Sequence, residues 1–238
     1  VANAKNEADQ KQLLLSMLDK NTIDYRLSSF TSQLSALQNA DGSFSWWPQM
    51  PGSSYITMSV VKMLTRLNSM LGEQPETKNV LQAAFECLDN EVAKEVTEMR
   101  RLEKKNAKKL APSELACNYL YANALAGRKK TADITYLVNL LEAMPTELTI
   151  YGKAGSAVIL NQYGKTKKAE EYLQSINEYT VYQEEMGRYY DTKRAQYSWF
   201  DYRIPTQVAA IEAMKALTPD NRKTIEEMQR KVLFELFV

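Results

Sequence analysis

Residues 151–176 read YGKAGSAVILNQYGKTKKAEEYLQSI and carry the strongest structural signal in the chain. The first half is dense in small and apolar residues on all sides of a helix and ends at Gly164, as a helix enclosed by protein does. The second half starts at the capping residue Thr166 and spaces its apolar residues at i, i+3, i+4 and i+7, namely Ala169, Tyr172, Leu173 and Ile176. The stretch therefore predicts an interior helix followed by an exterior one.

The same alternation recurs along the chain. Helices that are apolar or small nearly all round are expected over 55–71, 113–127 and 204–217, and an amphipathic helix follows each of them. With only 8 Gly and 7 Pro, the chain lacks the frequent turns that an all-β domain needs. We expect about ten helices in two layers, because only an inner layer is enclosed on every side.

Two architectures fit paired helices in two layers: an α/α toroid, which is a ring, and an open solenoid such as a tetratricopeptide array. The segment 155–176 alone is similar to one tetratricopeptide unit. The interior helices, however, are expected to start at positions 55, 113, 151 and 204, at spacings of 58, 38 and 53 residues. A tetratricopeptide array keeps a period of about 34. We therefore predict an all-α fold, an incomplete α/α toroid that forms a single domain over residues 1–238.

The stretch 179–202 departs from the helical rhythm. It holds eight aromatic residues, several of which alternate with polar ones. Such alternation is typical of a strand rather than a helix. We predict a short hairpin or an irregular insertion here.

Composition and charge exclude several classes of function. The 30 Lys and Arg residues against 29 Asp and Glu give a net charge of +1, which provides no field for nucleic acid or an anionic membrane. The chain has no His and two Cys, so Ser-His-Asp, Cys-His and His-metal sites are excluded. No apolar run approaches 18 residues. We expect no nucleic-acid binding, no direct membrane contact, no metal, no cofactor and no enzymatic activity.

The sharpest local motif is the turn Gln38-x-x-Asp41-Gly42-Ser43-Phe44. Gly42 can adopt the turn dihedral, Asp41 can accept hydrogen bonds from the amides that follow it, and Phe44 can plug the space between helix ends. The motif resembles a turn that recurs in α/α toroids, including triterpene cyclases and thioester domains. A cyclase would also need an Asp-rich proton donor, and zinc-binding prenyltransferase toroids need His, and this chain has neither. We interpret the motif as a turn that seals adjacent helices.

Aromatic and acidic side chains supply the candidate contact residues. The aromatic set comprises Trp46, Trp47, Tyr189, Tyr190, Tyr197, Trp199 and Tyr202. These rings could form a sugar- or peptide-binding platform, or they could pack over the ends of inner helices. Two of Asp41, Asp191 and Asp201 could supply a glycosidase carboxylate pair. We take Asp41, Trp46, Trp47, Tyr190, Trp199 and Asp201 as candidate ligand or partner contacts and assign no catalytic residue.

A longer series of motifs resembles one family. LQNADGSFSWW at 37–47, MP at 50–51 and YIT at 55–57 are similar to alpha-2-macroglobulin-like proteins of bacteria, particularly those of the Bacteroidetes type. YLYA at 119–122, MGRYY at 186–190, YSWF at 197–200 and IPTQ at 204–207 follow in the family's order. The resemblance covers residues 13–238 and implies a thioester-domain-like α/α toroid. The start of the sequence, without Met or a signal-peptide core, is that expected of a piece of a larger multidomain protein.

The resemblance also implies a function and a location. Members of the family are secreted or lipid-anchored protease traps, in which a protease cuts a bait region and a thioester between a Cys and the Gln three residues later can acylate it. This chain holds no such pair, because Asn90 stands three residues after Cys87 and Leu120 three after Cys117. Both cysteines are interpreted as core residues. We expect a non-enzymatic structural or interaction domain of an endopeptidase inhibitor, in the periplasm or at the cell surface.

Partners and rival functions follow from these interpretations. The expected partners are the neighbouring domains of the parent protein and, through the parent, target proteases. One alternative is a toroid carbohydrate-active enzyme that uses Asp41 with Asp191 or Asp201. The other is a tetratricopeptide-like adaptor that holds a peptide in its concave face.

Overall fold

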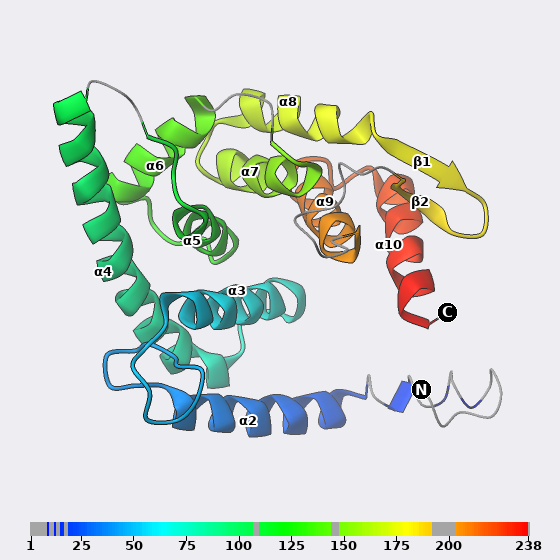
Figure 1. Ribbon diagram of the computed structural model, residues 1–238. Helices are drawn as coiled ribbons and strands as arrows, with labels where there is room; N and C mark the ends of the chain where they lie inside the picture. The colour runs from blue at the N-terminus through cyan, green and yellow to red at the C-terminus, as the bar shows by residue number, and fades with distance from the viewer. Residues whose placement is uncertain are drawn as a thin grey trace. The chain divides into compact units, whose positions relative to one another are not determined.

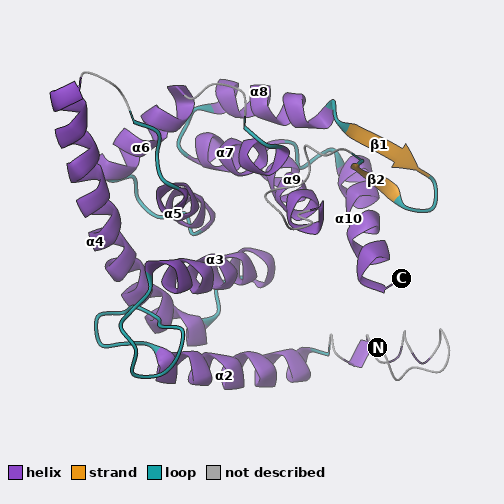
Figure 2. Ribbon diagram, in the orientation of Figure 1, coloured by secondary structure: helices purple, strands orange, loops and turns teal. Residues whose placement is uncertain are grey.

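The computed structural model of the chain describes residues 9, 12, 15–16, 19–106, 110–143, 148–191 and 203–237. They are mostly helical, with one small sheet of two strands (Figures 1 and 2). The elements are α2 (Lys20–Leu37), α3 (Ser54–Leu71), α4 (Pro75–Asn106), α5 (Glu114–Leu125), α6 (Ala132–Ala143), α7 (Ile150–Gln162), α8 (Thr166–Asn177), β1 (Thr180–Gln183), β2 (Gly187–Tyr190), α9 (Arg203–Leu217) and α10 (Arg222–Phe237). The prediction of a helical fold class is confirmed.

The chain divides into two compact units, Val1–Glu91 and Val92–Val238. The boundary falls inside α4, so the first unit holds α2, α3 and the N-terminal part of α4. The second unit holds the rest of α4, the other helices and the hairpin. The sequence predicts one domain over residues 1–238, whereas the packing of the described residues has two centres.

Helices α2 and α3 of the first unit begin at side-chain caps. The Asp19 carboxylate accepts a hydrogen bond from the Thr22 amide, and the Ser53 hydroxyl accepts one from the Ile56 amide. Buried apolar side chains of the unit include Leu34, Met58, Val61, Leu64, Val80, Leu81, Phe85 and Leu88. These residues come from all three helices, so each helix contributes to the core.

Helix α3 has one open face. The sequence predicts that 55–71 is enclosed all round, but Met63 and Met70 are 46% and 78% exposed. Met58 and Val61, which lie elsewhere on the helix, are buried. A helix side is buried only where another element covers it. The prediction is therefore wrong for the face that carries Met63 and Met70.

Helix α7 is the centre of the second unit. It packs against α5, α8 and α9 (Figure 1). Its buried side chains surround the helix: Ile150, Lys153, Ala154, Ser156, Ala157, Val158, Ile159 and Leu160. The following helix, α8, buries the single stripe Ala169, Tyr172, Leu173 and Ile176. The prediction of an interior helix followed by an exterior one is confirmed for this pair.

A hydrogen bond joins two neighbours of α7. The Tyr121 hydroxyl on α5 donates it to the Glu212 carboxylate on α9. A Cβ added at Gly155 on α7 would lie 3.9 Å from Cδ2 of Tyr121, which is ordinary van der Waals contact, so the Tyr121 ring lies beside α7 without requiring a glycine there.

A β-hairpin interrupts the helical series. Strands β1 and β2 are antiparallel, with Thr180 opposite Tyr190 and Gln183 opposite Gly187. Strand β2 packs against α10, and the Arg188 guanidinium forms an ion pair with Glu227 at 3.0 Å. The predicted hairpin within 179–202 is confirmed over 180–190, and residues 192–202 lie outside the described part of the chain.

Candidate functional site

The predicted turn in the first unit is held by its own polar groups. Nε2 of Gln38 donates to the carbonyl oxygens of Gly42, at 2.9 Å, and Val80, at 3.0 Å. The Phe44 amide donates to the Thr57 hydroxyl at 2.9 Å, and the Phe44 ring is 2% exposed. The motif therefore joins the end of α2 to α3 and α4, which agrees with its interpretation as a sealing turn.

The Asp41 carboxylate is engaged inside this turn. Its Oδ1 accepts hydrogen bonds from the Ser43 amide, at 3.0 Å, and the Ser43 hydroxyl, at 2.6 Å. These bonds from Ser43 hold the pKa of Asp41 below its usual range. A carboxyl that is kept ionised suits a turn rather than a general acid, which needs a raised pKa.

An exposed cluster of aromatic rings follows the turn, and we call Trp46, Trp47 and Tyr55 the aromatic face. Trp46 is stacked on Tyr55, with ring centroids 6.0 Å apart and planes at 12°. Its centroid lies 6.3 Å from that of Trp47. The three side chains are 58% to 67% exposed. The two tryptophans predicted as contact residues are therefore exposed, and their role as contacts stays a prediction; Tyr55, which the sequence analysis did not single out, stacks on Trp46.

The other predicted contact residues belong to the second unit or lie outside the described residues. Tyr190 is 4% exposed and lies on β2, so it faces protein rather than bulk solvent. Asp191 directly follows this strand and is exposed. Tyr197, Trp199, Asp201 and Tyr202 lie outside the described residues. The described members of the aromatic set are therefore divided between the units, with Trp46 and Trp47 in the first and Tyr189 and Tyr190 in the second.

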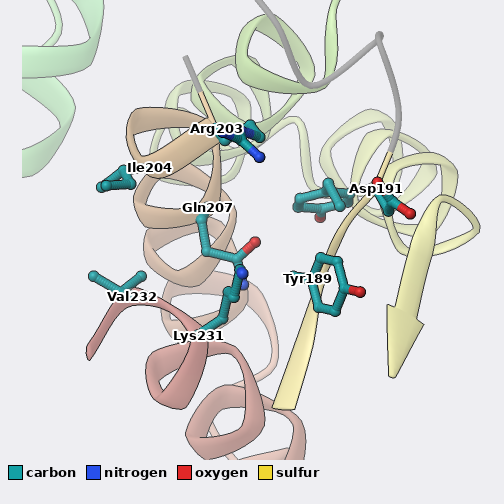
Figure 3. Close-up of a pocket in the computed structure, with 8 residues that line it drawn as sticks. Tyr189, Asp191, Arg203, Ile204, Gln207, Lys231 and Val232 are labelled. Carbon is teal, nitrogen blue, oxygen red and sulfur yellow. The ribbon is translucent and has the colours of Figure 1, made fainter. Parts of the chain in front are cut away.

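A pocket lies beside Tyr190 in the second unit (Figure 3). The cavity has a volume of about 40 Å³, and its lining residues are Tyr189, Tyr190, Asp191, Arg203, Ile204, Gln207, Lys231 and Val232. Helices α9 and α10 bring Gln207 and Lys231 to the side chains at the end of β2 (Figure 3). Sequence reasoning missed the five residues of α9 and α10 because only tertiary packing brings them to β2.

Contacts within the pocket fix several of these side chains. Nε2 of Gln207 donates to the carbonyl oxygens of Arg188, at 2.7 Å, and Met228, at 3.2 Å. Nζ of Lys231 lies 4.8 Å from the centroid of the Tyr189 ring. The pocket thus has a rigid amide on one wall and a cation over an aromatic ring on another.

Cys87 and Cys117 are the two cysteines of the chain. Cys87 and Cys117 form no disulfide, and burial, followed by the nearby Glu95 and Glu114, raises the pKa of the Cys117 thiol to about 11. Across the described part of the chain, no group of three or more Cys, Asp and Glu is arranged to hold a metal ion. Nor does any helix in that part have the length and apolar character to span a membrane.

No protein-family model matches the chain, and no curated protein sequence matches it at a significant level.

Proposed function

We propose that the chain is a non-catalytic helical interaction domain, an incomplete α/α toroid, of an alpha-2-macroglobulin-like protease trap in the periplasm or at the cell surface. The motif series from 37–47 to 204–207 supports the family, because several motifs occur in the family's order. The inner position of α7 between α5 and α9 supports a layered arrangement of helices. The domain contributes rigidity and contact surface, and the chemistry of the trap resides in other parts of the parent protein.

One observation carries the interaction role: large exposed apolar side chains are concentrated in the first unit. Among the described residues, eleven of the fourteen such side chains belong to this unit, and they are Leu15, Tyr25, Phe30, Leu37, Trp46, Trp47, Met50, Tyr55, Met63, Met70 and Leu71. Exposed apolar clusters mark interaction sites in folded proteins, and Trp46, Trp47 and Tyr55 form such a cluster in this unit. The first unit therefore presents the surface that a neighbouring domain of the parent would cover.

The aromatic face is the strongest part of this surface. Tyr and Trp side chains provide a large contact area and lose few rotatable bonds on binding. Stacking of Trp46 on Tyr55 already orders two of the rings before a partner arrives. The Asp41 turn next to them is held by hydrogen bonds within the chain, so its role is to position the face.

The test uses the complete protein that carries this chain. Trypsin is incubated with an excess of that protein, and hydrolysis of a small chromogenic peptide is compared with hydrolysis of a large protein substrate. A trap encloses the protease, so we expect the small substrate to be cleaved and the large one to be protected. Equal cleavage of both substrates, with and without the protein, would contradict the proposed function.

A pair of variants tests the role of the aromatic face. Replacing Trp46 and Tyr55 together by Ala removes the stacked rings, and we expect the complete protein to lose protection of the large substrate. The matched control is Tyr182→Ala, which removes a ring that is 50% exposed on β1. Equal effects of the double variant and the control would show that the aromatic face has no particular part in the assembly.

A further inference from the structure

The rings of the aromatic face lack a contact that rings of the second unit have. In that unit, tyrosine rings lie under Lys or Arg side chains whose charged group is 4.8 to 6.0 Å from the ring centroid, and they are Tyr136, Tyr163, Tyr172, Tyr182 and Tyr189. Within the described part of the chain, no cation lies over Trp46, Trp47 or Tyr55, although these side chains are 58% to 67% exposed. Their faces are therefore open to a cation that a partner supplies.

The sequence around the aromatic face carries a single charge, and it is negative. Between Arg26 and Lys62, the only charged residue is Asp41. Its carboxylate is exposed, and hydrogen bonds from Ser43 lower its pKa, so it is ionised at neutral pH. It forms no ion pair with a cation of the described residues. The stretch between Arg26 and Lys62 therefore offers a negative charge and open aromatic rings, both of which attract a cation.

The Asp41 turn lies at the base of the loop that leads to the rings. The loop joins α2 to α3 (Figure 2), and its two ends are held together where the Ser53 amide donates to the Phe44 carbonyl oxygen at 2.8 Å. Ser43, which donates to the Asp41 carboxylate, lies against Gly52, because a Cβ added at Gly52 would overlap the Ser43 hydroxyl. Both ends of the loop thus lie beside the turn, so one partner segment can reach the rings and the carboxylate.

The chemistry of these groups favours arginine over lysine as the cation. A guanidinium is planar, stacks on aromatic rings and is weakly hydrated, whereas an ammonium is compact and strongly hydrated. An exposed ring gains most from a cation that gives up little hydration when it binds. A guanidinium also pairs with a carboxylate through two parallel hydrogen bonds.

We propose that the aromatic face binds an arginine-bearing segment of its partner, with a guanidinium stacked on Trp46, Trp47 or Tyr55 and a positive charge set against Asp41. This inference rests on the interaction role proposed above and names the chemistry of the surface that docks there. The part of a neighbouring domain that covers the aromatic face accordingly carries exposed arginine.

The experiment compares three peptides on the chain 1–238. The first is acetyl-Gly-Arg-Gly-Arg-Gly-amide, the second has citrulline in place of both arginines, and the third has lysine. Citrulline has nearly the shape of arginine but no charge. Binding is followed by the NMR shifts of the indole N–H signals of Trp46 and Trp47. We expect the arginine peptide to bind about tenfold more tightly than the citrulline peptide and about threefold more tightly than the lysine peptide.

Two pairs of variants locate the contacts. Asp41→Asn removes the charge and keeps an oxygen that accepts from Ser43, and its control is Asp24→Asn, which removes an exposed charge from α2. Trp46→Leu removes a ring of the aromatic face, and its control is Tyr25→Leu, which removes a ring that is 77% exposed on α2. Asp41→Asn and Trp46→Leu should each weaken binding of the arginine peptide about threefold, and the controls should bind it as the unmodified chain does.

Several outcomes would overturn the inference. Equal binding of the arginine and citrulline peptides would assign the face to an uncharged partner, and equal binding of the arginine and lysine peptides would remove the choice of arginine. No binding of the arginine peptide up to about 10 mM, or equal effects of each variant and its control, would also contradict it. Because the peptides are compared on the unmodified chain, failure here leaves the protease-trap test standing, and failure of that test leaves the peptide comparison standing.

Discussion

The two units of this chain use apolar helices in different ways. In the second unit, α7 is buried around its circumference, and few large apolar side chains of the described residues remain exposed there, namely Val181, Tyr182 and Leu233. In the first unit, α3 carries Ser59 and Arg66 on the same side as Met63 and Met70, and both methionines are exposed. Composition alone therefore does not make a helix interior, because burial depends on how many elements surround it.

This difference separates a unit that covers its own core from one that leaves many large apolar side chains exposed. Helix α7 has α5, α8 and α9 around it, and the stripe of α8 completes the cover. The first unit contributes two whole helices and part of a third, too few elements to cover every apolar side. Its exposed side chains are the reason that we propose an interaction role.

The largest expected effect compares a buried leucine of α7 with an exposed methionine of α3. Leu160 is 0% exposed, so Leu160→Ala should lower the free energy of unfolding by about 3 to 4 kcal/mol through lost burial and a residual cavity. Met70 is 78% exposed, so Met70→Ala should change it by less than about 0.5 kcal/mol. Urea unfolding followed by circular dichroism measures both. A loss at Met70 as large as that at Leu160 would remove the contrast between the units.

A smaller effect concerns the turn that positions the aromatic face. Gly42 and Gly72 have φ of +84° and +86°, so a Cβ strains the backbone at both positions. At Gly42 the added Cβ would also overlap the Ala83 carbonyl oxygen, whereas at Gly72 it would meet no described heavy atom within 4 Å. Gly72 has ψ of 167°, a region that is essentially restricted to glycine, so we expect Gly42→Ala to cost about 3 kcal/mol and Gly72→Ala about 2 kcal/mol in thermal unfolding. Similar losses of stability in the two variants would show that the backbone at Ala83 moves aside at little cost.

Gly187 extends this comparison to the second unit. Its φ is +80°, and a Cβ there would overlap the carbonyl oxygen of Glu227 on α10. Gly187→Ala should therefore be about as costly as Gly42→Ala, about 3 kcal/mol, although the two glycines serve different units. A much smaller loss at Gly187 would mean that the hairpin moves away from α10 at little cost.

Local patterns predicted the parts of the fold that depend on neighbours in sequence. The stripe of α8 follows from helical spacing, and the hairpin at 180–190 follows from a change in that spacing. The open face of α3 was not predicted, although Ser59 and Arg66 share it with Met63 and Met70 at helical spacing and mark it as the more polar side. The division into two units was also not predicted, since it depends on contacts between segments far apart in the chain.

The candidate sites show the same difference between residues in a local motif, which were predicted, and residues brought together by packing, which were not. Trp46 and Trp47 were predicted as contacts because they follow a recognisable turn, and both are exposed. Gln207 and Lys231 were not predicted, because each has an ordinary place on its helix. They line a pocket only because α9 and α10 pack against β2, and no local sequence pattern predicts that packing.

The last prediction concerns the reactivity of the Cys117 thiol in the second unit, a change that leaves the stability of the fold untouched. Burial raises the pKa of Cys117 from 9.0 to about 11, so at pH 8 the folded chain should hold about a hundredfold less thiolate there than the unfolded chain. Because the thiolate is the nucleophile, the reaction of Cys117 with Ellman's reagent should be about a hundredfold slower in the folded Cys87→Ser variant than in the same variant in urea. The rate should rise with pH up to about 11 rather than level off near 9. Equal rates in the folded and unfolded chain would show that the second unit opens around α5. The second unit would then not be the closed one, and its contrast with the first unit would fail.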